Sequence, residues 1–234
     1  MARHVSGKLM EWNLRPDSYV LYLGRFSPEK NCHLLIDAFE KLDTDMKLVL
    51  AGGSSHTDSY AKSLLGRKSD KIRFLPWVAG NDLLELLSNA ALFVLPSELE
   101  GMSLALLDAM AAGVCALTSD IPENRELVEG CGFTFRRGDQ ADLERMLDLL
   151  IQSPELRLQA ANRQREQIQN QYLWPEIAQA IEKTYYNVLG WSTEGQPSAL
   201  IHIGMSAAEA GAASIEAERS SALSSVATGT LNSR

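Results

Sequence analysis

Short apolar runs alternate with longer amphipathic segments from residue 19 onward. Six runs have the length of β-strands, and they lie at residues 19–24, 47–51, 72–75, 92–95, 115–118 and 132–135. Several are almost continuously apolar, which is typical of strands buried on both faces of a parallel sheet. Because these strands alternate with helical segments, the pattern predicts an α/β fold, a doubly wound parallel sheet of the Rossmann-like type.

The segments between the strands have the apolar periodicity of helices that pack on a sheet. In residues 32–42, Leu35, Phe39 and Leu42 fall on one face and Asp37 falls on the other. Further helices are expected at residues 82–89, 103–112, 140–152, from 154 onward and at 175–189. The helices at 82–89 and 103–112, like the one at 32–42, fit βαβ crossovers. The other three follow the last strand and form a helical extension at the carboxyl end.

Three residues carry signals for the ends of these helices. Gly113 follows the helix expected at 103–112, where a left-handed residue commonly ends a helix. Asp139 can cap the helix at 140–152, and Pro154 stands at the first position of the next helix, where its missing N–H costs no hydrogen bond.

The chain divides into a lead-in at residues 1–18, one α/β domain at 19–190 and a tail at 191–234. The tail is rich in Ser, Ala, Gly and Thr, so we expect it to be disordered. The amino-terminal residues lack the apolar run of a signal peptide, and no stretch approaches the roughly 18 apolar residues that span a bilayer. We therefore expect a soluble, cytoplasmic protein with no transmembrane segment.

Charge and cysteine usage exclude several classes of partner. The net charge of −8 and the pI of about 5.1 disfavour a broad basic face, so nucleic acid is not an expected partner. Cys32, Cys115 and Cys131 are odd in number and widely spaced, which favours a reducing compartment over a disulfide framework. The four histidines are scattered, so no metal site is expected.

Two cations follow the first strand, and both can face one anion. Gly24 and Arg25 end the strand, and Lys30 lies five residues after Arg25, at the entry to the next helix. Ligands of doubly wound sheets bind outside the carboxyl ends of strands, where helix N-termini present free N–H groups. A diphosphate suits this position. The alternative is a solvated loop whose cations pair with Glu29.

A second polar turn follows the strand at 92–95. Glu100 lies in this turn, and Asp108 lies in the next helix, five residues beyond Ser103 and therefore roughly 7 Å along the axis. The free N–H groups of Met102, Ser103 and Leu104 lie between the two acids and can donate to phosphate or hydroxyl oxygens. The alternative is that Glu100 is an ordinary turn residue and Asp108 a solvent-facing helix acid.

These residues resemble the E-x7-E signature of retaining glycosyltransferases with the GT-B architecture, particularly family 4; here the signature is E-x7-D. The similarity extends from about residue 19 to 189 and includes GRFSPEKN at 24–31, LVLAGG at 48–53, FLPWV at 74–78 and TSDIPENRELV at 118–128. The resemblance implies a carboxy-terminal donor-binding domain whose Gly24 and Gly53 lie at the donor site. It also implies the roles of four side chains: Arg25 and Lys30 bind the donor diphosphate, Glu100 contacts the transferred sugar, and Asp108 contacts the ribose.

The sequence departs from the family pattern at three positions. Asp108 is one methylene shorter than the usual glutamate, so its ribose contact is expected to be stretched or mediated by water. Asn31 replaces a common glycine, and asparagine tolerates the left-handed conformation well. Trp77 replaces a frequent glycine, where an indole can narrow the base pocket or stack on the base.

The resemblance also implies transfer with retention of anomeric configuration, without a cofactor beyond the nucleotide-sugar substrate. Family members have an amino-terminal domain that binds the acceptor, and only residues 1–18 precede the first strand here. We therefore expect the acceptor domain to lie on another chain or to be missing from this fragment. A nucleotide-sugar-binding module without transferase activity is the alternative. A dinucleotide oxidoreductase is disfavoured, since the first strand is not followed by G-x-G-x-x-G.

Overall fold

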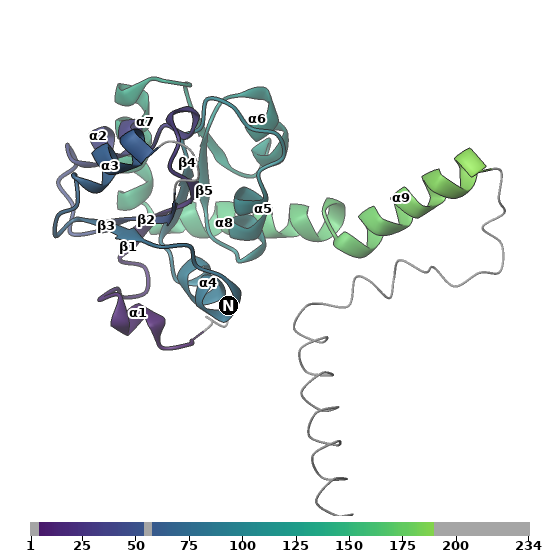
Figure 1. The fold of residues 1–234 in the computed structure, drawn as a ribbon, viewed down its shortest axis with the longest axis horizontal. Helices are drawn as coiled ribbons and strands as arrows, with labels where there is room; N and C mark the ends of the chain where they lie inside the picture. Colours follow the sequence, from purple (N-terminus) through teal and green to yellow (C-terminus); the bar gives the residue numbers. More distant parts are fainter. Residues whose placement is uncertain (1–4, 54–57, 190–234) are drawn as a thin grey trace, which may run out of the picture. The chain divides into compact units, whose positions relative to one another are not determined.

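The computed structural model describes residues 5–53 and 58–189, and its centre is a six-stranded sheet in which all neighbouring strands are parallel (Figure 1). The strands are β1 (Tyr19–Arg25), β2 (Lys47–Gly53), β3 (Ile72–Leu75), β4 (Leu92–Leu95), β5 (Ala116–Ser119) and β6 (Phe133–Phe135). The prediction of a doubly wound α/β sheet is confirmed.

The order of the strands places a switch point between β1 and β4. The sheet runs β3-β2-β1-β4-β5-β6, so the chain builds outward from β1 to β3 and then returns to the other side of β1. Every residue of β4 and β5 is buried, which explains their nearly continuous apolar sequences. In such a sheet the loops that leave β1 and β4 diverge and form a crevice at the carboxyl edge.

Helices cover the sheet on both faces. Helix α2 packs against α7, and α5 packs against α4 and α8. The helices described up to residue 171 are α1 (Lys8–Glu11), α2 (Cys32–Phe39), α3 (Asp58–Leu65), α4 (Gly80–Ser88), α5 (Leu104–Ala111), α6 (Pro122–Val128), α7 (Gln140–Gln152) and α8 (Pro154–Gln171), with one turn of 3₁₀ helix, η1 (Pro28–Lys30).

The predicted helix ends agree with the structure in most places. Gly113 has a left-handed φ of 73°, and the Asp139 carboxylate caps α7 by accepting the N–H of Asp142 at 2.9 Å. The helix expected at 32–42 is an exception, because α2 ends at Phe39. The N–H of Leu42 bonds to the carbonyl of Phe39, three residues back, so the chain tightens into a 3₁₀ turn.

The chain separates into two compact units, residues 1–171 and 172–234. The second contains α9 (Trp174–Leu189), in which no residue is buried. The predicted tail at 191–234 lies outside the described residues. Within residues 5–53 and 58–189, no helix combines the length and the apolar content needed to cross a bilayer.

Candidate functional site

The loop after β1 carries the predicted cations. Arg25 is the exposed last residue of β1, and Lys30 ends η1. Pro28 starts this turn without losing a hydrogen bond, and Asn31 ends it in the left-handed conformation, with φ 51° and ψ 32°. The expectation that asparagine preserves this turn is confirmed.

The loop after β4 carries the predicted carboxylate and leads into α5. Ser97 is fully buried at the start of this loop, and Glu100 lies at its centre. Ser103 caps α5, because its hydroxyl accepts the N–H of Leu106 at 3.4 Å. The first turn of a helix leaves its leading N–H groups without intrahelical partners, so the N–H groups near Ser103 remain a potential anion site.

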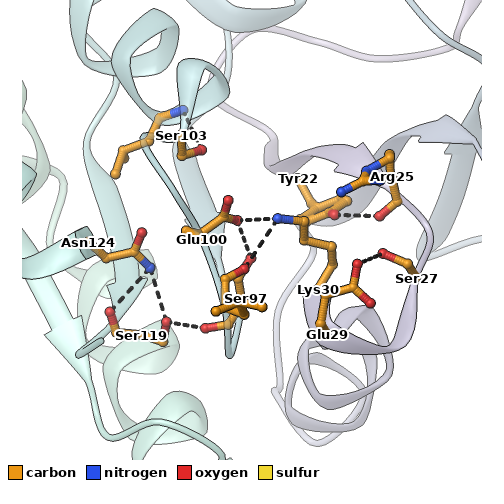
Figure 2. Close-up of polar contacts among 12 residues, drawn as sticks. Tyr22, Arg25, Ser27, Glu29, Lys30, Ser97, Glu100, Ser103, Ser119 and Asn124 are labelled. Atoms are coloured by element: carbon orange, nitrogen blue, oxygen red, sulfur yellow. Dashed lines mark hydrogen bonds and ion pairs between the residues drawn. The ribbon is translucent and has the colours of Figure 1, made fainter. Parts of the chain in front are cut away.

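The two loops meet in an ion pair between Lys30 and Glu100. The Nζ of Lys30 lies 2.8 Å from Oε1 of Glu100, and the side chains are only 13% and 9% exposed. Lys30 also donates to the carbonyl of Leu99 at 3.4 Å, and the Ser97 hydroxyl donates to Oε1 of Glu100 at 2.6 Å. Figure 2 shows this pair between the two loops. The ammonium group therefore lies beside the Glu100 turn, at the switch point.

Among the described residues, neither loop cation forms an ion pair with Glu29. Glu29 accepts a hydrogen bond from the Ser27 hydroxyl at 2.6 Å, whereas Lys30 pairs with Glu100. The pKa of Glu29 is lowered, first by the Ser27 hydroxyl, then by its own backbone N–H, and further by the charges of Arg25 and Lys30. Both cations therefore lie within electrostatic reach of the same carboxylate.

Two more hydrogen bonds tie the loops together, and neither was predicted. The N–H of Glu98 donates to the carbonyl of Glu29 at 2.8 Å, and the Asn31 amide donates to Oε1 of Glu98 at 3.0 Å. Only the backbone conformation of Asn31 can be predicted from the sequence, because its side-chain contact depends on the loop that follows β4. Ser97 was also missed, although it stands three residues before Glu100.

Glycines allow close approach at the ends of β1 and β2. Gly24 is in register with Gly52, and their φ values of 155° and 150° favour glycine. A Cβ on Gly52 would lie 1.8 Å from the carbonyl oxygen of Gly24, so any residue other than glycine would clash with the backbone of β1. A Cβ on Gly53 would lie 2.8 Å from Nε1 of Trp77, so the indole lies directly over this glycine.

Asp108 does not join the Lys30–Glu100 pair. It is exposed on α5, and its carboxylate makes no hydrogen bond or ion pair with a residue that the structure describes. Although the residue as a whole is exposed, the protein around its carboxyl group displaces part of the hydration and raises its pKa above the ordinary aspartate value. Met102 and Leu104 are 61% and 58% exposed near the start of α5, so the edge of the site beside Glu100 is apolar.

A pocket of about 500 Å³ opens at the carboxyl ends of β1, β2 and β3. The rings of Phe26 and Phe74 meet edge to face in its wall, with centroids 5.8 Å apart. Its lining is mainly apolar and comprises Phe26, Gly52, Gly53, Ala61, Lys62, Leu65, Phe74, Leu75 and Pro76. Among the described residues, no three His, Cys, Asp or Glu side chains are grouped as metal ligands.

The fold and this site define a class of protein, the glycosyltransferases of the GT-B type. Similar solved structures include the Anabaena protein Alr3699/HepE in complex with UDP-glucose, with a TM-score of 0.72 and 21% identity over 78% of this chain and 52% of that one. The Glycosyl transferases group 1 family model matches residues 11–167, so the chain belongs to this family.

Two curated relatives are similar in sequence. The O-antigen chain mannosyltransferase B of Escherichia coli is 32% identical over 151 residues, which are 62% of this chain and 39% of the relative. The N,N'-diacetylbacillosaminyl-diphospho-undecaprenol alpha-1,3-N-acetylgalactosaminyltransferase of Campylobacter jejuni is 30% identical over 76% of this chain and 46% of the relative. The chain therefore spans less than half the length of both.

Proposed function

We propose that this chain is the donor-binding part of a retaining family 4 glycosyltransferase. It holds a nucleotide-diphosphate sugar and transfers the sugar to an acceptor that an additional domain binds. The observation that carries the proposal is the Lys30–Glu100 pair, because it places a cation and a carboxylate together at the switch point of the sheet. The Anabaena protein with the same fold was solved with UDP-glucose, which supports a donor of this type.

The side chains have separate roles in this proposal. Arg25 and Lys30 hold the diphosphate, together with the N–H groups at the start of α5, and stabilise the charge that develops as the glycosidic bond breaks. Glu100 contacts the transferred sugar, and Asp108 contacts the ribose. These cationic and N–H donors stabilise the leaving phosphate, and the proposal includes no metal or other cofactor.

The compartment is also part of the proposal. Cys32, Cys115 and Cys131 are free and buried. We infer a reducing, cytoplasmic location from these unpaired thiols.

A binding module without transferase activity is the second candidate. One observation favours it: the proposed donor contacts, at residues 24–108, all lie within the single unit formed by residues 1–171. Both candidates require the donor site, and they differ in whether sugar is transferred when an acceptor-binding domain is present.

Donor binding is tested by thermal unfolding of the full chain with UDP, UDP-glucose, GDP and GDP-mannose. A ligand at 100 times its dissociation constant stabilises the folded state by about 2.7 kcal/mol. Arg25→Ala and Lys30→Ala should each remove most of this stabilisation. Lys41→Ala is the matched control, because Lys41 also pairs with a glutamate, Glu144, at 3.5 Å. Equal stabilisation in all three variants would remove Arg25 and Lys30 from the site.

A further inference from the structure

We propose that Ser119 and Asn124 are positioning residues that act through Ser97 on the Glu100 carboxylate. They fix how Glu100 meets the sugar part of the donor, while the diphosphate is held by other groups. This inference rests on the proposed function and deepens it, because it assigns a specificity role to residues behind the site.

A series of hydrogen bonds that passes through the backbone and side chain of Ser97 joins these residues (Figure 2). The Asn124 amide donates to the Ser119 hydroxyl at 3.1 Å and more weakly to its carbonyl at 3.4 Å. The Ser119 hydroxyl donates to the carbonyl of Ser97 at 2.5 Å, and the Ser97 hydroxyl donates to Oε1 of Glu100 at 2.6 Å. Ser97, Ser119 and Asn124 are each 0% exposed, so water does not compete for these bonds.

The series has one direction. The Asn124 amide and the Ser119 hydroxyl each donate in the direction of Ser97, and the Ser97 hydroxyl donates to a carboxylate that also binds the Lys30 ammonium. The first two of these bonds share the Ser119 hydroxyl, so they polarise each other in a poorly hydrated interior, and Ser97 itself connects them to the bond with Glu100. The contacts also restrain both the backbone and the side chain of Ser97, because its carbonyl accepts a hydrogen bond from Ser119 while its hydroxyl donates to Glu100.

The orientation of Asn124 supports this assignment. Its Oδ1 is buried and has no hydrogen-bond partner among the described residues, which is unfavourable. Turning the amide over would place Oδ1 against the Ser119 carbonyl, which cannot donate, and against a hydroxyl that already donates to Ser97. The amide nitrogen must therefore face Ser119. An apolar residue would avoid the unsatisfied oxygen, but it would also remove the donor that starts the series.

The arrangement occupies only one oxygen of Glu100. Both Lys30 and Ser97 bind Oε1, and no described residue binds Oε2. Figure 2 shows the second oxygen directed away from both donors. With Oε1 fixed, Oε2 has a defined position from which it can accept a hydrogen bond from a sugar hydroxyl. Loss of the series should therefore weaken binding of the sugar while binding of the diphosphate is retained.

The test compares the dissociation constants of UDP with UDP-glucose, and of GDP with GDP-mannose, by calorimetry on the full chain. Ser97→Ala, Ser119→Ala and Asn124→Ala should weaken binding of the nucleotide sugar by about 3- to 10-fold and change binding of the nucleotide alone by less than about 2-fold. Thr118→Val is the matched control, since Thr118 is equally buried on β5 and its hydroxyl has no partner among the described residues. It should leave both constants within about 2-fold.

The Glu100→Ala background separates positioning from general stability. If Asn124 acts through Glu100, Asn124→Ala should have no further effect on sugar binding once the carboxylate is absent. Ser97→Ala removes a single oxygen beside Glu100 and tests the same contact should Asn124→Ala fail to fold. Equal losses for nucleotide and nucleotide sugar, or losses no larger than in Thr118→Val, would overturn the inference and leave the proposed function standing. Failure of the unmodified chain to bind any of the four ligands would overturn both.

Discussion

Asn31 combines a backbone geometry and a side-chain contact that few residues provide together. Its left-handed φ of 51° lets η1 turn directly into α2, and its amide donates to Glu98 in the loop after β4. Glycine would supply the backbone geometry but not the contact. Asn31 therefore helps to fix the spacing of the two loops that bring Lys30 and Glu100 together.

The order of stability among variants at position 31 tests this dual role. Asn31→Gly should lower the free energy of unfolding by about 1 kcal/mol through loss of the hydrogen bond. Asn31→Ala should lower it by a further 1 kcal/mol or so, because a left-handed conformation is strained in residues with a Cβ. Urea denaturation gives both values.

Asn162 provides the control for this series. It is exposed in the interior of α8, where alanine is more stable than glycine by about 1 kcal/mol. The order of the alanine and glycine variants should therefore reverse between positions 31 and 162. The same order at both positions would show that the left-handed conformation of Asn31 does not determine its stability.

The sequence was sufficient to predict which two loops form the site but not the hydrogen bonds that connect the loops. Lys30 and Glu100 each follow a buried strand, and the carboxyl ends of parallel strands meet at one edge, so their proximity could be predicted. The bonds of Ser97 and Asn31 depend on the paths of two loops, which have no periodic pattern. The exposure of Asp108 was likewise open, because the sequence of a helix does not define how much of each residue its neighbours cover.

Elements that the sheet buries could be predicted closely, and those that depend on distant contacts could not. Strand β4 has the predicted bounds, because its continuous, fully buried apolar run leaves little choice of register. Strand β3 also has the predicted bounds, although it contains Arg73 and only Ile72 is buried. Helix α1 has only four residues, too few for a helical period, and it forms because it packs on α4. Glu85 of α4 attaches α1 to the domain, because its carboxylate accepts hydrogen bonds from residues 6–8. Glu85 is only 2% exposed.

The attachment of α1 should depend on the charge of Glu85. Burial favours the neutral acid, but hydrogen bonds from Ser6, Gly7 and Lys8 prevail and lower the pKa of Glu85. A lowered pKa in the folded state means that the stabilisation is present above the unfolded value of about 4.3 and is lost as the pH falls through the folded value. Glu85→Gln should reduce the free energy of unfolding by roughly 1–2 kcal/mol at pH 7 and by less near pH 3.

Urea denaturation at both pH values measures this difference, and amide hydrogen exchange shows whether α1 opens. Glu11→Gln is the control, because Glu11 lies in α1 but its side chain is 63% exposed and, among the described residues, forms an ion pair only with Lys8. It should change stability by less than about 1 kcal/mol. Equal pH dependence in the two variants would contradict the role of Glu85.

The molecule as a whole is acidic, so its affinity for an anionic donor must arise locally. Its net charge is −8. Even so, Arg25, Lys30 and the start of α5 lie at the carboxyl edge of the sheet, in or beside the loops that leave β1 and β4. A compact site of this kind can bind a diphosphate without a basic surface. All of these groups belong to the unit formed by residues 1–171.

Transfer should require more than this unit. The proposed donor contacts come from residues 24–108, and the relatives of this chain are more than twice as long as the part that it matches. A positioned acceptor accounts for much of the rate of a bimolecular transfer, since orienting two reactants can supply roughly 7–11 kcal/mol of the barrier. We therefore expect the chain to bind nucleotide sugar but to transfer no measurable sugar until an acceptor-binding domain is added, for example the amino-terminal domain of a related glycosyltransferase. Radiolabelled UDP-glucose and GDP-mannose would show the transfer.

In the mixture of the chain with the acceptor-binding domain, Lys30→Ala should abolish transfer, whereas Lys41→Ala should not. Transfer by the chain alone would contradict the expectation.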